Sequence, residues 1–142
     1  MECLPSTAGR VRRVEANGRN EVADSALFIR WGATAPGRER KSVELFGESL
    51  RFLVGLVTSG QVASVEPFFL QPHGGDLEGF FIVRGERTEL EKVRISDEFQ
   101  RLQVRAQAVV QNFGVIEAIT AEQLNKHMAW FTEAAREVGS TG

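Results

Sequence analysis

The sequence predicts a single α+β domain in which a four-stranded antiparallel sheet carries its helices on one face. Two observations indicate this fold class. The hydrophobic patterns alternate as strand, helix, strand, strand, helix, strand, with one further helix at the end. In addition, residues 61–85 (QVASVEPFFLQPHGGDLEGFFIVRG) combine two strand patterns with a Gly-rich turn, and large apolar side chains fall on both faces of both strands.

Composition narrows the class of protein. The chain has 142 residues, of which 42% are hydrophobic and 25% charged, as is usual for one globular domain. A formal net charge of −2 gives no electrostatic case for nucleic-acid binding. No apolar run is long enough to span a bilayer, and the first 18 residues lack the apolar core of a signal peptide. With Cys3 as the single cysteine we expect no internal disulfide and a cytoplasmic location.

The first half of the chain is predicted to hold a tail, a strand and a long helix. Residues 1–23 have little apolar content and are predicted to be a mobile tail, and residues 24–139 form the domain. A strand is expected over residues 25–34 and a helix over 38–59, which ends at Gly60. The sheet-facing stripe of this helix is predicted to contain Val43, Phe46, Leu50, Leu53, Val54 and Val57. Leu45, Phe52 and Leu56 form a second apolar strip, which indicates a neighbouring helix.

The second half is predicted to complete the sheet. Strands are expected over residues 62–71 and 77–84, with residues 72–76 (PHGGD) as the turn. Thr88 with Glu91 fits the capping box of a short helix, and Ser96 or Asp97 caps a longer one. Residues 113–119 form the last strand. Residues 120–138 form a terminal helix whose core stripe is Leu124, Met128, Phe131 and Ala135. Two split strand–helix–strand units in this order give the ferredoxin-like arrangement.

Alternation along the strands sorts their side chains into two faces. The face predicted to lie under the helices holds Leu27, Ile29, Trp31, Val65, Phe69, Leu77, Phe81, Val83 and Ile116. The opposite face is predicted to hold Phe28, Arg30, Glu66, Phe68, Leu70, Phe80, Ile82, Arg84, Val115, Glu117 and Ile119. So much clustered apolar area exceeds what a soluble monomer normally exposes. We therefore expect a homodimer with two sheets packed face to face.

The chain also resembles a known group of proteins. The segments PHGGDLEGFFIVRG, ISDEFQRL and FGVIEAI, together with the strand order, are similar to the dimeric α/β-barrel superfamily, and within it to YCII-related small bacterial proteins. The resemblance covers residues 26–138. It implies a dimeric barrel, in a superfamily that includes cofactor-free monooxygenases, isomerases, haem enzymes and ligand-binding modules. In YCII-related proteins it also implies a histidine and an aspartate at the cleft.

Four charged residues, Arg30, Arg84, Glu66 and Glu117, are predicted to face the barrel interior. One interpretation is structural, because buried charges are costly unless they are paired and two salt bridges could close the dimer interior. The other is a ligand site, in which an arginine fork holds a carboxylate or enolate. The sequence leaves both interpretations open.

The turn offers one candidate catalytic pair. His73, with Asp76 three residues later, could be a general base and its orienting carboxylate. The alternative is an ordinary hairpin turn, since Gly74 and Gly75 already explain the segment. No zinc-ligand spacing, phosphate loop or dinucleotide fingerprint is found, so no metal or cofactor is predicted.

These observations favour a dimeric barrel protein that binds a small apolar or aromatic molecule bearing an acidic group. The predicted ligand-binding residues are Phe28, Arg30, Glu66, Phe68, Phe80, Ile82, Arg84 and Glu117. Two alternatives stay open, namely a cofactor-independent oxygenase or isomerase that uses His73 and Asp76, and an accessory dimer that binds nothing. No nucleic-acid or membrane partner is expected.

Overall fold

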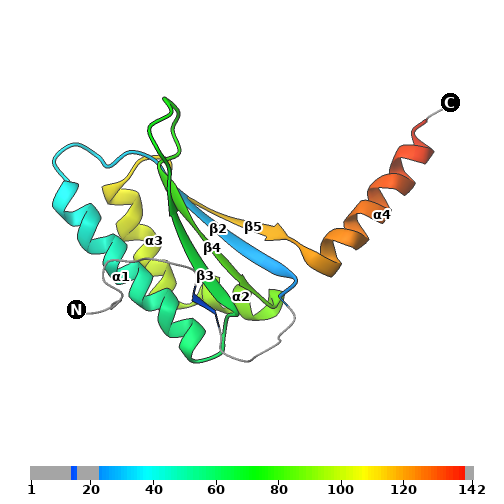
Figure 1. Cartoon of the computed structure of the whole chain (residues 1–142), viewed down its shortest axis with the longest axis horizontal. Helices are drawn as coiled ribbons and strands as arrows, with labels where there is room; N and C mark the ends of the chain where they lie inside the picture. The colour runs from blue at the N-terminus through cyan, green and yellow to red at the C-terminus, as the bar shows by residue number, and fades with distance from the viewer. Residues whose placement is uncertain (1–13, 16–22, 140–142) are drawn as a thin grey trace.

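The computed structural model describes residues 14–15 and 23–139, which form one antiparallel sheet and four helices (Figure 1). The strands are β1 (Val14–Glu15), β2 (Ser25–Trp31), β3 (Ser64–Phe69), β4 (Gly79–Gly85) and β5 (Gly114–Ile119). The helices are α1 (Glu39–Thr58), α2 (Arg87–Ile95), α3 (Asp97–Val109) and α4 (Ala121–Glu137). The spatial order of the strands is β1-β3-β4-β2-β5, and all neighbours are antiparallel.

The predicted fold class is confirmed. Strands β3, β4, β2 and β5 form a four-stranded antiparallel sheet in which β4 and β2 are central, and the connection from β2 to β3 passes through α1. Buried residues from each of α1, α2 and α3 share one core cluster with β2, β3 and β4. Two strand–helix–strand units are thus interleaved in one sheet with helices on one face, which is the ferredoxin-like arrangement.

One short strand was not predicted. Val14 and Glu15 form β1, which pairs with Val65 and Ser64 at the outer edge of β3. The mobile tail over residues 1–23 stays a prediction, because the structure describes only residues 14–15 and 23 of that segment. Pairing along β3 satisfies backbone groups that an edge strand otherwise exposes. Two residues carry too weak an alternation to be recognised as a strand in a sequence.

The helix-covered side of the sheet holds the main core. Its buried members include Leu27, Ile29, Val65, Phe81 and Val83 from the strands and Leu50, Leu53, Val57, Leu90, Val93 and Phe99 from the helices. A second cluster joins Leu45 of α1 to Ala106 and Val109 of α3, so the predicted second strip of α1 does meet another helix. Val43 is 73% exposed, so its predicted place in the sheet-facing stripe is wrong.

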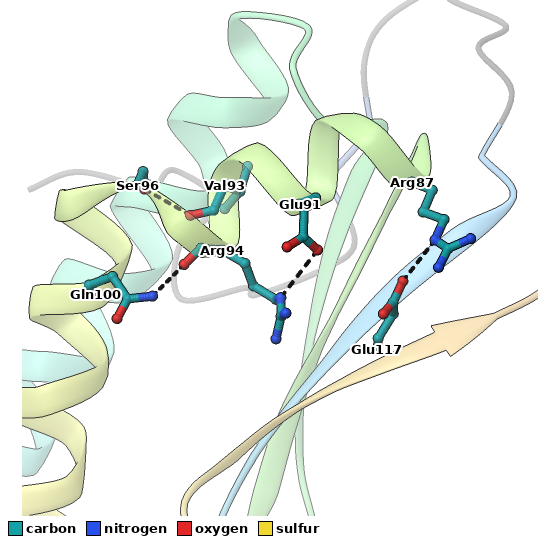
Figure 2. Close-up of polar contacts among 7 residues, drawn as sticks. All are labelled: Arg87, Glu91, Val93, Arg94, Ser96, Gln100 and Glu117. Carbon is teal, nitrogen blue, oxygen red and sulfur yellow. Dashed lines mark hydrogen bonds and ion pairs between the residues drawn. The ribbon is translucent and has the colours of Figure 1, made fainter.

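A single serine joins α2 to α3. The Ser96 hydroxyl donates a hydrogen bond to the carbonyl of Val93 at 2.8 Å and accepts one from the backbone amide of Phe99 at 3.3 Å. The side-chain amide of Gln100 donates a hydrogen bond of 2.7 Å to the carbonyl of Arg94 (Figure 2). Ser96 therefore ends one helix and caps the next, as the sequence predicted for the N-cap of α3.

The register of β5 differs from the prediction. Ile116 pairs with Phe28, Glu117 with Leu27 and Val115 with Ile29. Directly opposed residues share a face, so Ile116 lies on the helix-free face, while Val115, Glu117 and Ile119 lie on the helix-covered face. The predicted faces of all four residues are wrong. A strand with apolar residues at both parities gives no alternation that specifies its face, and a shift of one residue exchanges the two faces.

Helix α4 stands apart from the rest of the domain. It follows β5 after Thr120 and projects away from the layer formed by α1 and α3 (Figure 1). None of its residues is buried, and the predicted core stripe is exposed, with Met128 at 54% and Phe131 at 67%. The prediction that this stripe packs in the core of its own domain is wrong. No described helix has the length and apolar composition that a bilayer crossing requires.

Candidate functional site

Three phenylalanines form a continuous apolar strip on the helix-free face of the sheet. The ring of Phe80 lies 4.7 Å from that of Phe28 and 4.8 Å from that of Phe68, measured between centroids. Ile82 extends the strip because it pairs with Phe28 on the neighbouring strand. These four side chains are only half-buried, and Ile116 beside them is 47% exposed. The apolar part of the predicted ligand site is therefore assembled on one face and left open in the single chain.

Arg30 lies on this face but is directed to the β3–β4 turn. Its Nη2 donates a hydrogen bond of 2.7 Å to the carbonyl oxygen of Asp76 and lies 3.8 Å from the Asp76 carboxylate. The aliphatic stem crosses Gly114, where an added Cβ would come within 3.5 Å of the Arg30 Cγ. One end of the guanidinium is thus held by the turn, while the Arg30 Nε is buried and has no hydrogen-bond partner among the described residues.

Arg84 and Glu66 are the other charged residues of the helix-free face. Both are half-buried, and they lie on adjacent strands, where Arg84 pairs with Ser64 and Glu66 pairs with Ile82. Within the described part of the chain no ion pair joins the two. The Arg84 Nη1 is buried and has no hydrogen-bond partner among the described residues. An unpaired buried guanidinium nitrogen is costly.

Glu117 does not belong to this group. It lies on the helix-covered face, where its carboxylate accepts a hydrogen bond of 3.2 Å from the Nε of Arg87 at the start of α2 (Figure 2). The side chains of Glu117 and Arg87 are 37% and 65% exposed, so water screens the ion pair. The predicted interior position of Glu117 is therefore wrong, and the residue ties α2 to the edge strand.

Both ring nitrogens of His73 contact backbone groups of the turn in which this residue lies. Its Nδ1 accepts a hydrogen bond from the backbone amide of Gly75 at 3.2 Å, and its Nε2 lies 2.7 Å from the carbonyl of Leu77. Nε2 must carry the proton, because Nδ1 is an acceptor and the Leu77 carbonyl cannot donate. Asp76 contacts Arg30 instead of His73, so the structure does not bring together the predicted pair of base and orienting carboxylate.

The structure also contains a cavity that the sequence did not predict. It lies between α1, α3 and the helix-covered face of the sheet, and its volume is about 300 Å³. The residues that line it are Ile29, Trp31, Ser42, Val43, Leu45, Phe46, Ser49, Phe52, Leu53, Phe69, Phe81, Phe99, Leu102, Gln103, Ala106, Val109, Val110 and Phe113. None of these lining residues is charged. We call this space the α1–α3 cavity.

One side of the cavity is a cluster of four aromatic rings. Trp31 lies 5.2 Å from Phe81 and 6.0 Å from both Phe46 and Phe69, between ring centroids. Phe46 and Phe81 are stacked at 5.5 Å with an interplanar angle of 11°. Phe69 is 66% exposed. Edge-to-face and offset contacts of this kind hold aromatic side chains in defined positions.

Three polar side chains interrupt the apolar lining. Ser42 and Ser49 come from α1, and Gln103 comes from α3. The hydroxyl of Ser42 accepts a hydrogen bond from Thr34 at 3.0 Å, which orients it beside the cavity. A few positioned polar groups in an apolar lining are typical of small-molecule sites.

The α1–α3 cavity could not be predicted from the sequence for a physical reason. Many of its lining residues belong to the apolar faces that the sequence predicted for α1 and the strands, among them Leu45, Phe46, Phe52, Leu53, Ile29, Trp31 and Phe81. Whether such faces close completely or leave a gap depends on side-chain volumes and on the angle between helix and sheet, which periodicity does not report. Within the described ranges no group of three or more His, Cys, Asp or Glu residues is placed to hold a metal ion.

Comparisons with known proteins add one finding. No known protein family and no curated protein matches the sequence. Among solved structures, a dimeric protein of unknown function with a ferredoxin-like fold from Bacteroides fragilis NCTC 9343 is similar, with 8% identity and a TM-score of 0.47. The similarity covers 67% of this chain and 95% of that one. The predicted resemblance to YCII-related proteins stays a prediction.

Proposed function

We propose that the protein binds a small molecule and that the α1–α3 cavity takes an uncharged, mainly aromatic or aliphatic ligand. The observation that carries this proposal is the cavity of about 300 Å³ with no charged residue in its lining. Ligand sites in proteins occupy about 300–1,000 Å³ and are lined mostly by apolar and aromatic side chains. A charged ligand would lose its hydration there without gaining a partner of opposite charge.

The same lining sets the orientation of the ligand. The rings of Trp31, Phe46 and Phe81 offer a rigid aromatic wall, and the opposite wall comes from α3 residues such as Leu102 and Ala106. A hydroxyl or carbonyl on the ligand would be directed toward Ser49 or Gln103, because buried polar groups require hydrogen-bond partners.

We further propose that the protein is a homodimer through the helix-free face. Phe28, Phe68, Phe80 and Ile82 form a strip that only a second cover can remove from water. Burial of apolar surface contributes about 25 cal/mol per Å², and a twofold arrangement lets the same strip cover itself.

A second candidate site lies on that face. The Nη1 of Arg84, which is buried and has no hydrogen-bond partner among the described residues, favours a carboxylate at the dimer interior, either from a ligand or from the partner's equivalent of Glu66. Arg30 has the same feature at its Nε, and it differs from Arg84 in that its Nη2 already donates a hydrogen bond to the Asp76 carbonyl. The cofactor-independent enzyme alternative has less support, since His73 is engaged on both ring nitrogens within its turn.

The cavity proposal is tested with the neutral fluorescent probe N-phenyl-1-naphthylamine. The chain has two tryptophans. In a Trp130→Phe background Trp31, which lines the cavity, is the single tryptophan donor. Probe bound in the cavity should quench Trp31 by energy transfer. Ser49→Phe, and separately Ala106→Leu, should fill the space and weaken binding about tenfold or more, while Val104→Phe on the exposed side of α3 should leave it unchanged. Binding that persists in both filled variants would place the probe elsewhere and refute the cavity site.

Sedimentation equilibrium tests the dimer. A single species of twice the chain mass at micromolar concentration is expected, and a clean monomer would refute the dimer. If Arg84 binds a carboxylate of an acidic ligand, Arg84→Met should abolish the stabilisation that 1-naphthoate gives in thermal denaturation. If Arg84 pairs only with a partner carboxylate, 1-naphthoate should have no effect on either protein.

A further inference from the structure

The terminal helix α4 is amphipathic, yet its apolar side is not buried. It is amphipathic, with Leu124, Met128, Phe131 and Ala135 recurring at helical spacing, and it buries none of them. Lys126 and Glu133 lie on the opposite side of the same helix. Helices in proteins obtain most of their stability from packing an amphipathic face, and isolated ones are marginal in water. The apolar stripe of α4 therefore requires a cover.

The position of α4 argues against its own subunit as that cover. Thr120 is the only residue between the end of β5 at Ile119 and the start of α4 at Ala121. The backbone amide of Thr120 donates a hydrogen bond of 3.2 Å to the carbonyl of Asp24, which anchors the junction to the chain just before β2. From this junction α4 points away from α1 and α3 (Figure 1). A link of one residue gives the helix little freedom to fold back.

Area provides an independent argument for a second copy. Strands lie about 4.8 Å apart and rise about 3.3 Å per residue, so one face of four strands covers roughly 400 Å². Two such faces packed together therefore bury roughly 800 Å². That is the scale of a lattice contact, below the roughly 1,200–2,000 Å² of specific, stable interfaces. A helix of 17 residues is about 25 Å long and about 10 Å wide. Two such arms, with the surfaces they cover, add roughly 1,000 Å², which brings the total into the stable range.

We infer that α4 is an exchange arm whose apolar stripe packs on the second copy of the chain. This inference rests on the proposed homodimer and adds to it a reciprocal contact from outside the sheet face. Twofold symmetry makes the contact mutual. The arm of each subunit is not covered by its own subunit and packs on the other one. The dissociation free energy of the dimer then has two main contributions, one from the contact of α4 and one from the helix-free face.

Two variants with equal change in charge test the arm. Met128→Glu with Phe131→Glu adds two negative charges to the apolar stripe at positions that are exposed in the subunit. Lys126→Gln with Ala129→Glu makes the same change in net charge on the polar side of α4. The first pair should raise the dimer dissociation constant tenfold or more in sedimentation equilibrium, and the second pair should change it less than about threefold.

Photo-cross-linking identifies what the stripe touches. With p-benzoylphenylalanine at position 131 and a mixture of ¹⁵N-labelled and unlabelled chains, cross-linked peptides should combine both isotopes. Cross-links confined to one isotope, or an unchanged dissociation constant in Met128→Glu/Phe131→Glu, would overturn the arm while leaving the sheet-face dimer in place. A wild-type chain that is monomeric at micromolar concentration would overturn both. Ile116→Glu on the helix-free face reports the sheet contact separately.

Discussion

The guanidinium of Arg30 on β2 holds the carbonyl oxygen of Asp76 in the β3–β4 turn at 2.7 Å. The two residues are 46 positions apart in the sequence, and the Asp76 side chain, which is 72% exposed, contributes only a contact of 3.8 Å. The turn that contains the predicted catalytic pair is therefore joined to β2 by this hydrogen bond. Arg30 acts on the backbone of this turn more than on its carboxylate.

Replacement of Arg30 should loosen the turn. Arg30→Met removes the hydrogen bond to the Asp76 carbonyl and should cost up to about 1 kcal/mol of unfolding free energy, with faster hydrogen exchange at residues 72–78. Asp76→Ala keeps that carbonyl and should change stability by less than about 0.5 kcal/mol, because the ion pair is exposed. Equal losses in urea denaturation for both variants would show that the carboxylate carries the contact.

The two ends of the α1 stripe should respond differently to truncation. Leu53 is 2% exposed in the main core, so Leu53→Ala should destabilise the domain by about 2–5 kcal/mol. Val43 belongs to the same sequence stripe but is 73% exposed, and Val43→Ala should change the unfolding free energy by less than about 0.5 kcal/mol. Chemical denaturation of both variants measures the difference. A large loss for Val43→Ala would indicate that a second subunit or α4 covers this part of α1.

Alanine substitutions at two glycines should have opposite effects on stability. A Cβ at Gly79 would lie 2.6 Å from the Phe68 carbonyl oxygen and 2.7 Å from the indole ring of Trp31. Gly79→Ala should therefore cost about 1–3 kcal/mol and shift the fluorescence of Trp31. A Cβ at Gly55 on α1 would meet nothing within 4 Å, so Gly55→Ala should stabilise the helix by about 0.5–1 kcal/mol. If Gly79→Ala were neutral, the close approach of Trp31 to β4 would be refuted.

Neighbouring residues of β5 should differ in their effect on the dimer. Ile116 lies on the helix-free face and Glu117 on the helix-covered face. Ile116→Gln should weaken the dimer severalfold, whereas Glu117→Gln should leave the dissociation constant unchanged and cost less than about 1 kcal/mol of unfolding free energy. Sedimentation equilibrium distinguishes them. The opposite result would restore the register that the sequence suggested.

Much of the fold could be predicted because its local signals agree with one another. The periodicity of α1, the N-cap at Ser96, the alternation in β2 and β4 and the turn over residues 72–76 all indicate the same interleaved sheet. The face of Phe28, Phe68 and Phe80 was assigned correctly because residues of the same parity share a face and the charged residues Arg30, Glu66 and Arg84 all fall in this parity set.

The candidate site could be predicted only in part. The aromatic strip and the positions of Arg30, Arg84 and Glu66 on the helix-free face are as the sequence indicated. The contact of Arg30 with Asp76 and the pair of Glu117 with Arg87 depend on how a turn and an edge strand dock, and neither has a sequence signature. The α1–α3 cavity depends on packing that is incomplete by a few side-chain volumes.

The sequence by itself determined the order of the main strands and helices along the chain, the two apolar faces of β2, β3 and β4 and the amphipathic character of α4, since these are properties of local spacing. Only the tertiary structure decided which face of the sheet each β5 side chain lies on and which group Arg30 contacts. It also decided where space is left between α1 and α3, and that α4 does not pack on its own domain. Each of these is settled by long-range contacts, in which small differences in packing and hydrogen bonding choose among arrangements that local patterns allow equally.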